Sequence, residues 1–354
     1  MEGMRIDSHK LLFHAERVSD WIKGKFVCPV CIEISPTDLC NHHCIFCGLD
    51  YGKRKGTFLD KKYVTRFVKG AAKKGLKAVI IAGEGEPLLD SNVTDFVTSF
   101  KKLKLDVAIT TNGVLMDRDF CEKNLKSLTW IRVSIDAGTA PVYKRMHNAS
   151  EKDFCKVLQN LNSAVSVKKK HGLKVTIGTQ FLLLKENQKD LINAAKVLKK
   201  IGVDYLIVKP YSKHPLSRNE AGTDIDYSNF SYLEDRLKKY SGNGFNIIFR
   251  SATMKKRFME KSYDRCLGVR FWAYISSDGE IYPCNTFYGV KRFSIGNVRG
   301  GSFTEIWNGE KCRTVFRHIE KKMDAKKCRE LCRLDEINSY LWRIRHPHEH
   351  ENFI

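Results

Sequence analysis

No apolar stretch in this 354-residue chain is long enough to span a bilayer, and no signal peptide is present at its start. The sequence therefore predicts a soluble, cytoplasmic protein with no membrane partner. In a reducing compartment its 12 cysteines are expected to form no disulfides. They must instead be explained as packed thiols or as metal ligands.

Acidic residues are scarce, since 40 Asp and Glu stand against 62 Lys and Arg, which leaves a formal net charge of +22. Such a balance favours acidic partners such as nucleotides, sugar phosphates or RNA. The lysines are spread over every predicted helix, without a basic cluster interleaved with aromatics, and no recognised RNA-binding module is present. This disfavours a nucleic-acid partner, which stays an alternative.

Three cysteines follow an apolar run with the spacing C-x3-C-x2-C, at Cys40, Cys44 and Cys47. A four-iron cluster normally takes four thiolates, so three leave one iron open to a group that is not protein. The alternative is a zinc site, but no fourth cysteine is nearby. His42 and His43 lie inside the three-residue spacer and are badly placed to close a tetrahedron. Spacing and ligand softness favour the iron-sulfur interpretation.

A glycine-rich turn, Gly83-Glu84-Gly85-Glu86-Pro87, follows the predicted buried strand in KAVIIAGEGEPLL. Glycine lets the backbone approach a ligand closely, and the free N–H and C=O groups at a strand end can receive an ammonium or a carboxylate. An ordinary strand-to-helix turn is the alternative.

Strand and helix patterns alternate through the first two thirds of the chain, which predicts a parallel sheet. Counting a first strand at residues 30–34 gives about six units, fewer than a closed eightfold barrel. The predicted fold is therefore α/β, a partial (βα)6 TIM-like barrel whose site lies at the carboxyl ends of its strands. Later strands are expected to end at Thr111, at Ser134 to Asp136, near Gln180 and near Lys209.

The barrel pattern ends near residue 235, and a shorter, turn-rich region follows. Cys266 and Cys284 bracket a predicted hairpin around Asp278-Gly279. Cys328 and Cys332 lie in KKCRELCR, where a helical turn would place both thiols on one face. The four cysteines form a plausible closed metal site, with structural zinc or uninvolved thiols as alternatives. The predicted division is 1–27, a helical segment; 28–235, the barrel; and 236–354, a small α+β extension with a tail.

The remaining cysteines are expected to lie outside both sets. Cys28 and Cys31 form C-x2-C but run into a strand, whose alternation would put them on opposite faces. Cys121 and Cys155 fall in helical patterns and are predicted to be buried. Cys312 has three interpretations: a packed core thiol, a replacement for one of the four later ligands, or a hydrogen-atom donor to a substrate radical.

The cysteine triplet resembles the signature of the radical S-adenosylmethionine (radical SAM) enzymes, C-x3-C-x-aromatic-C on the loop after the first barrel strand. Phe46 supplies the aromatic residue. The resemblance implies that Cys40, Cys44 and Cys47 hold a 4Fe-4S cluster whose open iron binds S-adenosylmethionine (SAM). It also implies that Phe46 lies near the adenine.

The glycine-rich turn is similar to the family's GGEP motif, with Glu84 in place of its first glycine. The resemblance implies contacts from this turn to the methionyl amine of SAM. Ser134 and Asp136 resemble a family strand whose polar side chains reach SAM, although strand-end polar residues also serve as caps. Lys209 and Tyr211 are candidate substrate contacts, with a solvated lysine as the alternative at 209. The cofactor-binding candidates are Phe46, Gly83, Glu84, Gly85, Glu86, Pro87, Asn112, Ser134, Asp136 and Gln180.

The extension resembles the SPASM and twitch extensions of radical SAM enzymes, which hold an auxiliary 4Fe-4S cluster. The resemblance assigns the ligands of this second cluster to Cys266, Cys284, Cys328 and Cys332. The helical pattern that opens the chain, MRIDSHKLLFHAERVSDWIKG, is expected to pack on the open barrel as a lid or plug.

The resemblance implies an oxidoreductase or epimerase that cleaves SAM reductively to a 5'-deoxyadenosyl radical. The expected substrate is a small polar molecule, which the basic composition allows to be anionic, such as a sugar, nucleotide-sugar or aminocyclitol. The hydrogen donor in an epimerisation would be a thiol such as Cys312, and the electron donor a flavodoxin or ferredoxin. Peptide modification is an alternative, although the roughly 28 residues before the first strand are short for the expected peptide-binding domain. RNA modification and non-catalytic metal binding also stay open.

Overall fold

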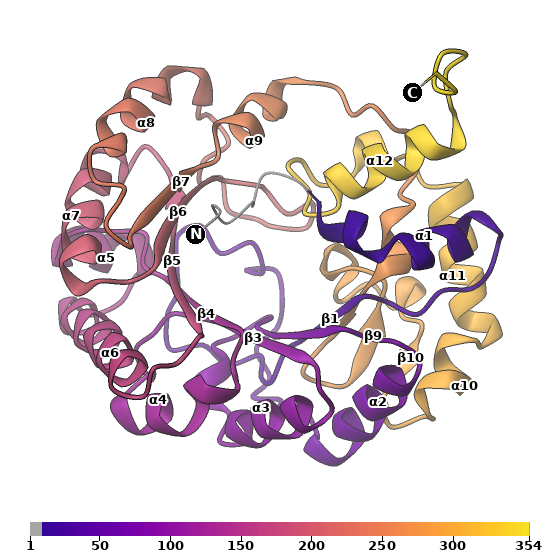
Figure 1. Cartoon of the computed structure of the whole chain (residues 1–354), viewed down its shortest axis with the longest axis horizontal. Coiled ribbons are helices and arrows are strands. Elements are labelled where there is room, and N and C mark those ends of the chain that lie inside the picture. The colour runs from indigo at the N-terminus through magenta and orange to yellow at the C-terminus, as the bar shows by residue number, and fades with distance from the viewer. Residues whose placement is uncertain (1–8, 354) are drawn as a thin grey trace.

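Ten strands form one continuous sheet in a computed structural model that describes residues 9–353 (Figure 1). Their order is β10-β9-β8-β1-β2-β3-β4-β5-β6-β7. The parallel strands are β1 (Cys31–Ile34), β2 (Ala78–Ile81), β3 (Asp106–Thr111), β4 (Trp130–Ser134), β5 (Thr176–Leu183), β6 (Tyr205–Pro210), β7 (Asn246–Phe249) and β8 (Trp272–Ile275). The antiparallel strands are β9 (Glu280–Tyr282) and β10 (Gly296–Asn297).

Helices cover the outside of the curved sheet (Figure 1). Those of the barrel are α2 (Lys61–Lys73), α3 (Val93–Lys102), α4 (Arg118–Asn124), α5 (Ala140–His147), α6 (Glu151–Lys170), α7 (Leu191–Ile201), α8 (Ser231–Lys238) and α9 (Ser251–Lys255). Their ends carry the expected signals. Asp60 caps α2, Ser150 and Asp153 form a capping box on α6, and Gly202 ends α7 in the left-handed region at φ 86°.

The two faces of the sheet differ in burial. On β4, Ile131 and Val133 are fully buried among the core residues, whereas Trp130, Arg132 and Ser134 keep accessible surface. The same alternation appears on β2. Alternate side chains of a strand point to opposite faces, so the partly accessible positions of these strands lie on the inner face of the curved sheet. We call the region that this face encloses the lumen.

The extension closes one side of the barrel. Its strand β8 pairs in parallel with β1, from Cys31 opposite Trp272 to Ile34 opposite Ile275. A hairpin then turns at Gly279, which has φ 83°, as the Asp-Gly signal predicts. The helices of the extension are α10 (Phe303–Trp307), α11 (Glu310–Lys321) and α12 (Asp335–Arg345). The proposed boundary at residue 235 falls inside α8, and the sheet continues beyond it through β7.

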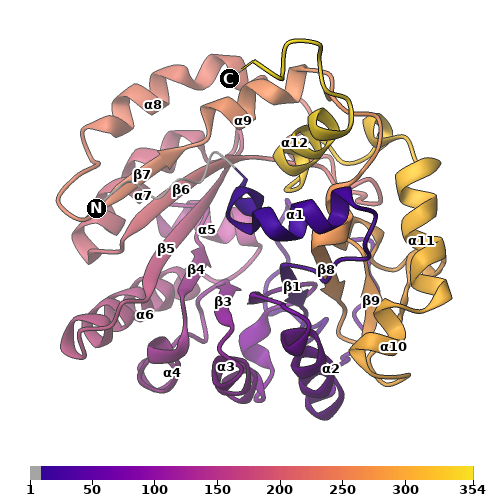
Figure 2. The ribbon, with the colours of Figure 1, turned by 45° about the vertical axis from the view of Figure 1, so that its right-hand side comes forward.

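The N-terminal helix α1 (Ala15–Ile22) lies beside α12 (Figure 2). Arg17 donates hydrogen bonds to the carbonyls of Cys28, Pro29 and Gly75, near the amino ends of β1 and β2. The prediction of a lid over the mouth of the barrel is therefore wrong, because α1 packs toward the opposite end of the barrel. An apolar cluster joins it to the extension through Leu11, Val18, Trp21, Val27, Leu267, Phe271 and Leu341.

Residues 1–8, the start of the predicted N-terminal segment, lie outside the described residues. Within residues 9–353, no helix is both long and apolar enough to cross a membrane.

Candidate metal centres and the space between them

The loop that carries the cysteine triplet follows β1 and is closed by its own hydrogen bonds. Asp38 accepts from the backbone N–H groups of Lys55 at 2.8 Å and Thr57 at 2.9 Å. Thr37 and Phe58 form an antiparallel bridge. These contacts join the two ends of the loop, so the cysteines between them are held at the carboxyl edge of the sheet.

The three cysteines of this loop converge. Burial raises the pKa of the Cys40 and Cys44 thiols, and the nearby sulfurs, including that of Cys47, raise it further. Like charges that raise one another's pKa favour a cation that takes the charge of all three thiolates. The set therefore fits the predicted role as metal ligands.

A histidine that the sequence did not indicate contacts this set. His147, at the end of α5, has Nδ1 3.2 Å from Cys44 Sγ and Nε2 3.0 Å from the Ile135 carbonyl oxygen. Its ring also packs edge-on against Phe46, with the centroids 5.6 Å apart. Burial lowers the pKa of His147 to about 3. With His42, the donor atoms of Cys44 and His147 lie within 4.8 Å of one another.

The glycine-rich turn packs directly on the triplet loop. The N–H of Glu86 donates to the Leu39 carbonyl at 2.7 Å. A Cβ at Gly85 would lie 2.0 Å from the Leu39 oxygen and 2.7 Å from the Thr37 oxygen. Gly83 has φ 112°, in the region that favours glycine. Close backbone approach thus requires these glycines beside Cys40.

The carboxyl group of Glu86 is engaged within the protein. It accepts from Thr111 Oγ1 at 2.5 Å, from the Asn112 N–H at 2.7 Å and from the Leu88 N–H at 3.0 Å. This ties the turn to the end of β3. Pro87 begins the short 3-10 helix η2 (Pro87–Leu89). Both carboxyl oxygens of Glu86 are thus engaged in holding the turn.

Glu84, the departure from the family motif, joins the turn to the extension. Its carboxyl group accepts from Tyr274 Oη at 2.8 Å and from Ser277 Oγ at 2.7 Å. Both partners belong to the β8–β9 hairpin. Burial raises the pKa of Glu84 to about 7, against hydrogen bonds that lower it.

The strand-end candidates fall into two pairs. Asp136, at φ 49°, is fully buried and accepts from the Leu182 N–H at 2.5 Å, and burial raises its pKa to about 7. Asn112 donates to Asn41 and accepts from the Val114 N–H. Both therefore hold the local backbone.

Ser134 and Gln180 form the second pair. They are register partners on β4 and β5, and both are half-buried. Neither side chain makes a hydrogen bond to another described residue. These two remain open to a ligand. Strand β5 runs on to Leu183, beyond the end predicted near Gln180.

The four later cysteines also converge. Burial raises the pKa of Cys266, Cys328 and Cys332, and each pair among these and Cys284 lies close enough to interact. The helical turn predicted for Cys328 and Cys332 is wrong. They lie in an irregular loop in which Leu331 adopts φ 47°. The need to bring thiols from a hairpin and a loop together overrides the local helical preference.

Amide groups hold the sulfurs of this set. Asn338 Nδ2 lies 3.5 Å from Cys266 Sγ, and the Leu334 N–H lies 3.4 Å from Cys332 Sγ. Lys261 Nζ donates to the carbonyl of Cys328. Hydrogen bonds to ligating sulfurs are a feature of iron–sulfur sites.

Within residues 9–353, the ligand atoms of His42, Cys44 and His147 all lie within 4.8 Å of one another. The sulfurs of neither cysteine set form such a compact group. Thiolates around one zinc ion would lie about 3.8 Å apart, given Zn–S distances near 2.3 Å. The wider spread of each set suits a multi-iron cluster.

Family profiles match both regions. The radical SAM superfamily profile matches residues 34–198, and that of the SPASM iron-sulfur cluster-binding domain matches residues 266–333. The chain belongs to the radical SAM superfamily. Its radical SAM domain binds a 4Fe-4S cluster and SAM, and its SPASM domain binds auxiliary iron–sulfur clusters.

Two curated relatives span most of this radical SAM chain. The tungsten-containing aldehyde ferredoxin oxidoreductase cofactor-modifying protein of Pyrococcus furiosus is 26% identical over 309 residues, 82% of this chain and 84% of that protein. The GTP 3',8-cyclase of Aquifex aeolicus is 25% identical over 336 residues, 83% of this chain and 94% of that protein.

A solved structure shares the fold of this radical SAM protein. Streptococcus suis SuiB bound to precursor peptide SuiA has a TM-score of 0.67 at 18% identity. The match covers 98% of this chain and 81% of that one. At this identity the likeness concerns the fold alone.

The two predicted substrate contacts of the radical SAM domain differ in position. Tyr211 is buried and donates to Asn219 Oδ1 at 2.9 Å, and Asn219 Nδ2 donates to the Cys47 carbonyl at 2.7 Å. Tyr211 therefore supports the triplet loop. Lys209 projects from β6 into the lumen, and burial lowers its pKa well below the ordinary value, assisted by three arginines.

The triplet loop and the SPASM domain contact each other near the carboxyl end of β6. Tyr51 stacks on His214, with ring centroids 4.9 Å apart, and its hydroxyl donates to the Tyr288 carbonyl at 3.2 Å. Arg329 of the SPASM loop donates to the Ser212 carbonyl at 2.8 Å. The two cysteine sets therefore border the same region of the radical SAM barrel.

Three of the remaining cysteines, Cys121, Cys155 and Cys312, lie on helices outside both sets. Cys312 is fully buried in the core on α11, and burial raises its pKa to about 12. This favours the core-thiol interpretation over a hydrogen donor. Cys121 is buried as predicted, but the prediction for Cys155 is wrong because it is exposed on α6.

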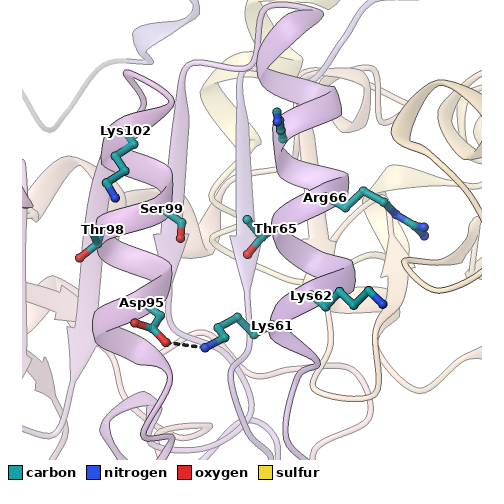
Figure 3. Close-up of a pocket in the computed structure, with 9 residues that line it drawn as sticks. Lys61, Lys62, Thr65, Arg66, Asp95, Thr98, Ser99 and Lys102 are labelled. Atoms are coloured by element: carbon teal, nitrogen blue, oxygen red, sulfur yellow. Dashed lines mark hydrogen bonds and ion pairs between the residues drawn. The ribbon is translucent and has the colours of Figure 1, made fainter.

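A surface groove between α2 and α3 has a volume of about 590 Å³ (Figure 3). Lys61 crosses it to pair with Asp95 at 2.5 Å. None of the predicted site residues lines this groove, and its lysines are solvated.

Proposed function

We propose that this radical SAM protein removes a hydrogen atom from a small polar substrate held in the lumen, between its two cysteine sets. The observation that carries this is the shared border of the two sets at the exit of β6, through Tyr51, His214 and Tyr288. A 4Fe-4S cluster with SAM at its open iron supplies a 5'-deoxyadenosyl radical when it is reduced.

The chain's own residues would prepare this chemistry. Cys40, Cys44 and Cys47 would hold the cluster, and the loop contacts of Leu39 with Glu86 would fix their backbone. Ser134 and Gln180 would meet polar parts of SAM from the inner face. Burial of the site would keep water from a reactive carbon radical.

Dehydrogenation is the outcome that we favour. An alcohol carbon that loses a hydrogen atom, then an electron and a proton, becomes a ketone. The SPASM cysteines lie beside the lumen, where a cluster could be held as electron acceptor. Epimerisation would need a hydrogen donor, and Cys312 is enclosed in the core.

The relatives suggest two further substrate classes. SuiB was crystallised with a precursor peptide, and its fold covers nearly all of this chain, which favours peptide modification as the second candidate. The GTP 3',8-cyclase acts on a nucleotide by its name, which favours a phosphorylated small molecule.

Anaerobic reconstitution with iron and sulfide tests the proposal. We expect about eight irons per chain, and about four after replacing Cys266 and Cys284 together with alanine. Cys155→Ala is the matched control, because this thiol is exposed and belongs to neither set.

Reduced wild-type protein should convert SAM to 5'-deoxyadenosine, and Cys44→Ala should not. An iron content of four that the double replacement leaves unchanged would remove the second cluster from the proposal. Failure of fully loaded wild type to cleave SAM in the presence of candidate substrates would count against the radical chemistry itself.

A further inference from the structure

Lys209 is a basic side chain inside the barrel without a partner among the described residues. It lies on the inner face of β6, and within residues 9–353 its Nζ makes no hydrogen bond or ion pair. An ammonium group removed from bulk water is costly unless it is paired. The group therefore calls for a partner that the chain does not supply.

Three guanidinium groups act on Lys209 from separate elements. Arg132 lies on β4, Arg250 follows β7, and Arg333 follows the SPASM ligand Cys332. The Arg250 N–H donates to the Val208 carbonyl at 3.1 Å, which places Arg250 next to the strand of Lys209. Their charges contribute to the lowered pKa of Lys209. We call Lys209, Arg132 and Arg333 the lumen cations.

Arg132 is held in a fixed orientation. Its Nε donates to Tyr205 Oη at 2.9 Å, and its guanidinium lies 4.8 Å from the centre of the Trp130 ring. Gly178 makes room for this arrangement, because a Cβ there would lie 2.0 Å from Cζ of Tyr205. In the described chain the two Nη groups of Arg132 donate no hydrogen bond, so they stay available to a ligand.

The nearby carboxylates do not balance the lumen cations. Glu33 forms an ion pair with Arg333, which also lies over the Trp272 ring at 4.7 Å. Lys209 and Arg132 have no ion pair within residues 9–353. Asp136 is the acidic group that acts on Lys209, but its burial favours the neutral carboxylic acid. Burial and the arginines favour the neutral amine of Lys209 in the unliganded protein, and an anion beside it would favour the ammonium.

We propose that the lumen cations form a subsite for a phosphate group of the substrate. This inference rests on the proposed function and names its substrate class, a phosphorylated small molecule. A phosphate dianion would stabilise the ammonium form of Lys209 together with the Arg132 guanidinium, and it offers several acceptor oxygens to forked guanidinium donors. A carboxylate of SAM carries one charge and would match only one of the two.

The position of the subsite suits this role. Lys209 is close enough to Asp136 for the two side chains to interact electrostatically. Oδ2 of Asp136 in turn lies 3.6 Å from Nε2 of His147, which contacts the triplet. Arg333 lies next to Cys332 in sequence, on the SPASM side. A phosphate held there would anchor a substrate between the two sets and leave its carbon skeleton in the lumen.

Binding of inorganic pyrophosphate to the reconstituted protein, measured by anaerobic calorimetry with saturating SAM, tests the subsite. Lys209→Met keeps much of the side-chain volume and removes the charge, and we expect it to weaken binding by about tenfold or more. Lys209→Arg should recover most of the affinity. Lys196→Ala, on the exposed face of α7, removes the same charge and should bind like wild type.

Several results would overturn the inference. Equal binding by Lys209→Met and wild type would do so, as would equal weakening by Lys209→Met and Lys196→Ala. Mutual exclusion of pyrophosphate and SAM would assign the cations to the SAM carboxylate instead. If wild type also cleaves SAM in the same preparation, a negative result concerns the phosphate subsite alone and leaves the proposed function standing.

Discussion

Glu84 shows how a departure from a family motif can have a structural cause. Its carboxyl group is buried between the turn after β2 and the β8–β9 hairpin, where Tyr274 and Ser277 donate to it. A glycine there would leave both hydroxyl groups without this acceptor. The residue therefore couples the turn after β2 to the SPASM domain.

The charge state of Glu84 predicts a pH dependence of stability. Burial raises its pKa from 4.5 to about 7, so the folded protein holds a proton that the unfolded chain has released. This stabilisation is fully present below about pH 4.5 and is lost as the pH rises through about 7. Between about pH 5 and pH 8, wild type should lose on the order of 1–3 kcal/mol relative to Glu84→Gln in urea unfolding.

Glu310→Gln, at an exposed position on α11, should give no such difference from wild type. Parallel stability curves for wild type and Glu84→Gln would show that the Glu84 proton does not contribute.

Residues whose chemistry is local were predictable from the sequence, and residues that act through the fold were not. The convergence of the seven cysteines of the two sets could be expected from residue type and spacing, and their role as cluster ligands stays a prediction. His147, Asn219 and Arg132 reach their places through helix ends and strand register, which single residues do not encode. Tyr211 ends the expected strand but turns its side chain to Asn219.

At the scale of elements, the contact between the turn and the triplet loop sets a strict limit on side-chain size. Gly85→Ala would place a Cβ 2.0 Å from the Leu39 oxygen, a backbone atom next to Cys40. The loop would have to move, so we expect a loss of about 1–3 kcal/mol and of roughly four irons after reconstitution. Unfolding curves and iron analysis would measure both.

Gly48→Ala is the matched control in the same loop. Its Cβ would meet only the Cβ of His214, at an ordinary 3.6 Å. Full iron content in Gly85→Ala would mean that the loop adapts without losing its ligands.

Elements with strong periodicity were predictable, and irregular ones were not. Helices α2, α3, α6 and α7 and the parallel strands follow apolar patterns that burial against the sheet requires. The loop from Cys328 to Cys332 has a helical sequence pattern, yet ligand convergence sets its conformation. The partners of α1 depend on residues more than 240 positions away, which no local pattern reports.

At the scale of the whole molecule, the SPASM region is part of the barrel's wall. Besides the pairing of β8 with β1, Phe303 packs on Phe67 of α2, with ring centroids 5.3 Å apart. Trp307 Nε1 donates to the Val27 carbonyl at 2.9 Å. The barrel and the extension should therefore unfold together.

We expect one cooperative denaturant transition for the full chain, with coincident far-ultraviolet and tryptophan signals. A chain ending at residue 250 should aggregate, because it exposes the edge of β1 and the apolar face of α2. A chain ending at residue 345, which lacks only the exposed tail, should behave like the full one. Two separate transitions, or a soluble native-like 1–250 fragment, would contradict this expectation.

The pairing of β8 with β1 also has a consequence during synthesis. The partner strand emerges from the ribosome roughly 240 residues after β1, about 10–50 s later at usual elongation rates. Through that interval one edge of β1 has no neighbouring strand, and the triplet loop follows the carboxyl end of β1. Cys40, Cys44 and Cys47 are therefore synthesised well before β8 pairs with β1. Closure of the barrel wall at this edge of β1 must wait for the last third of the chain.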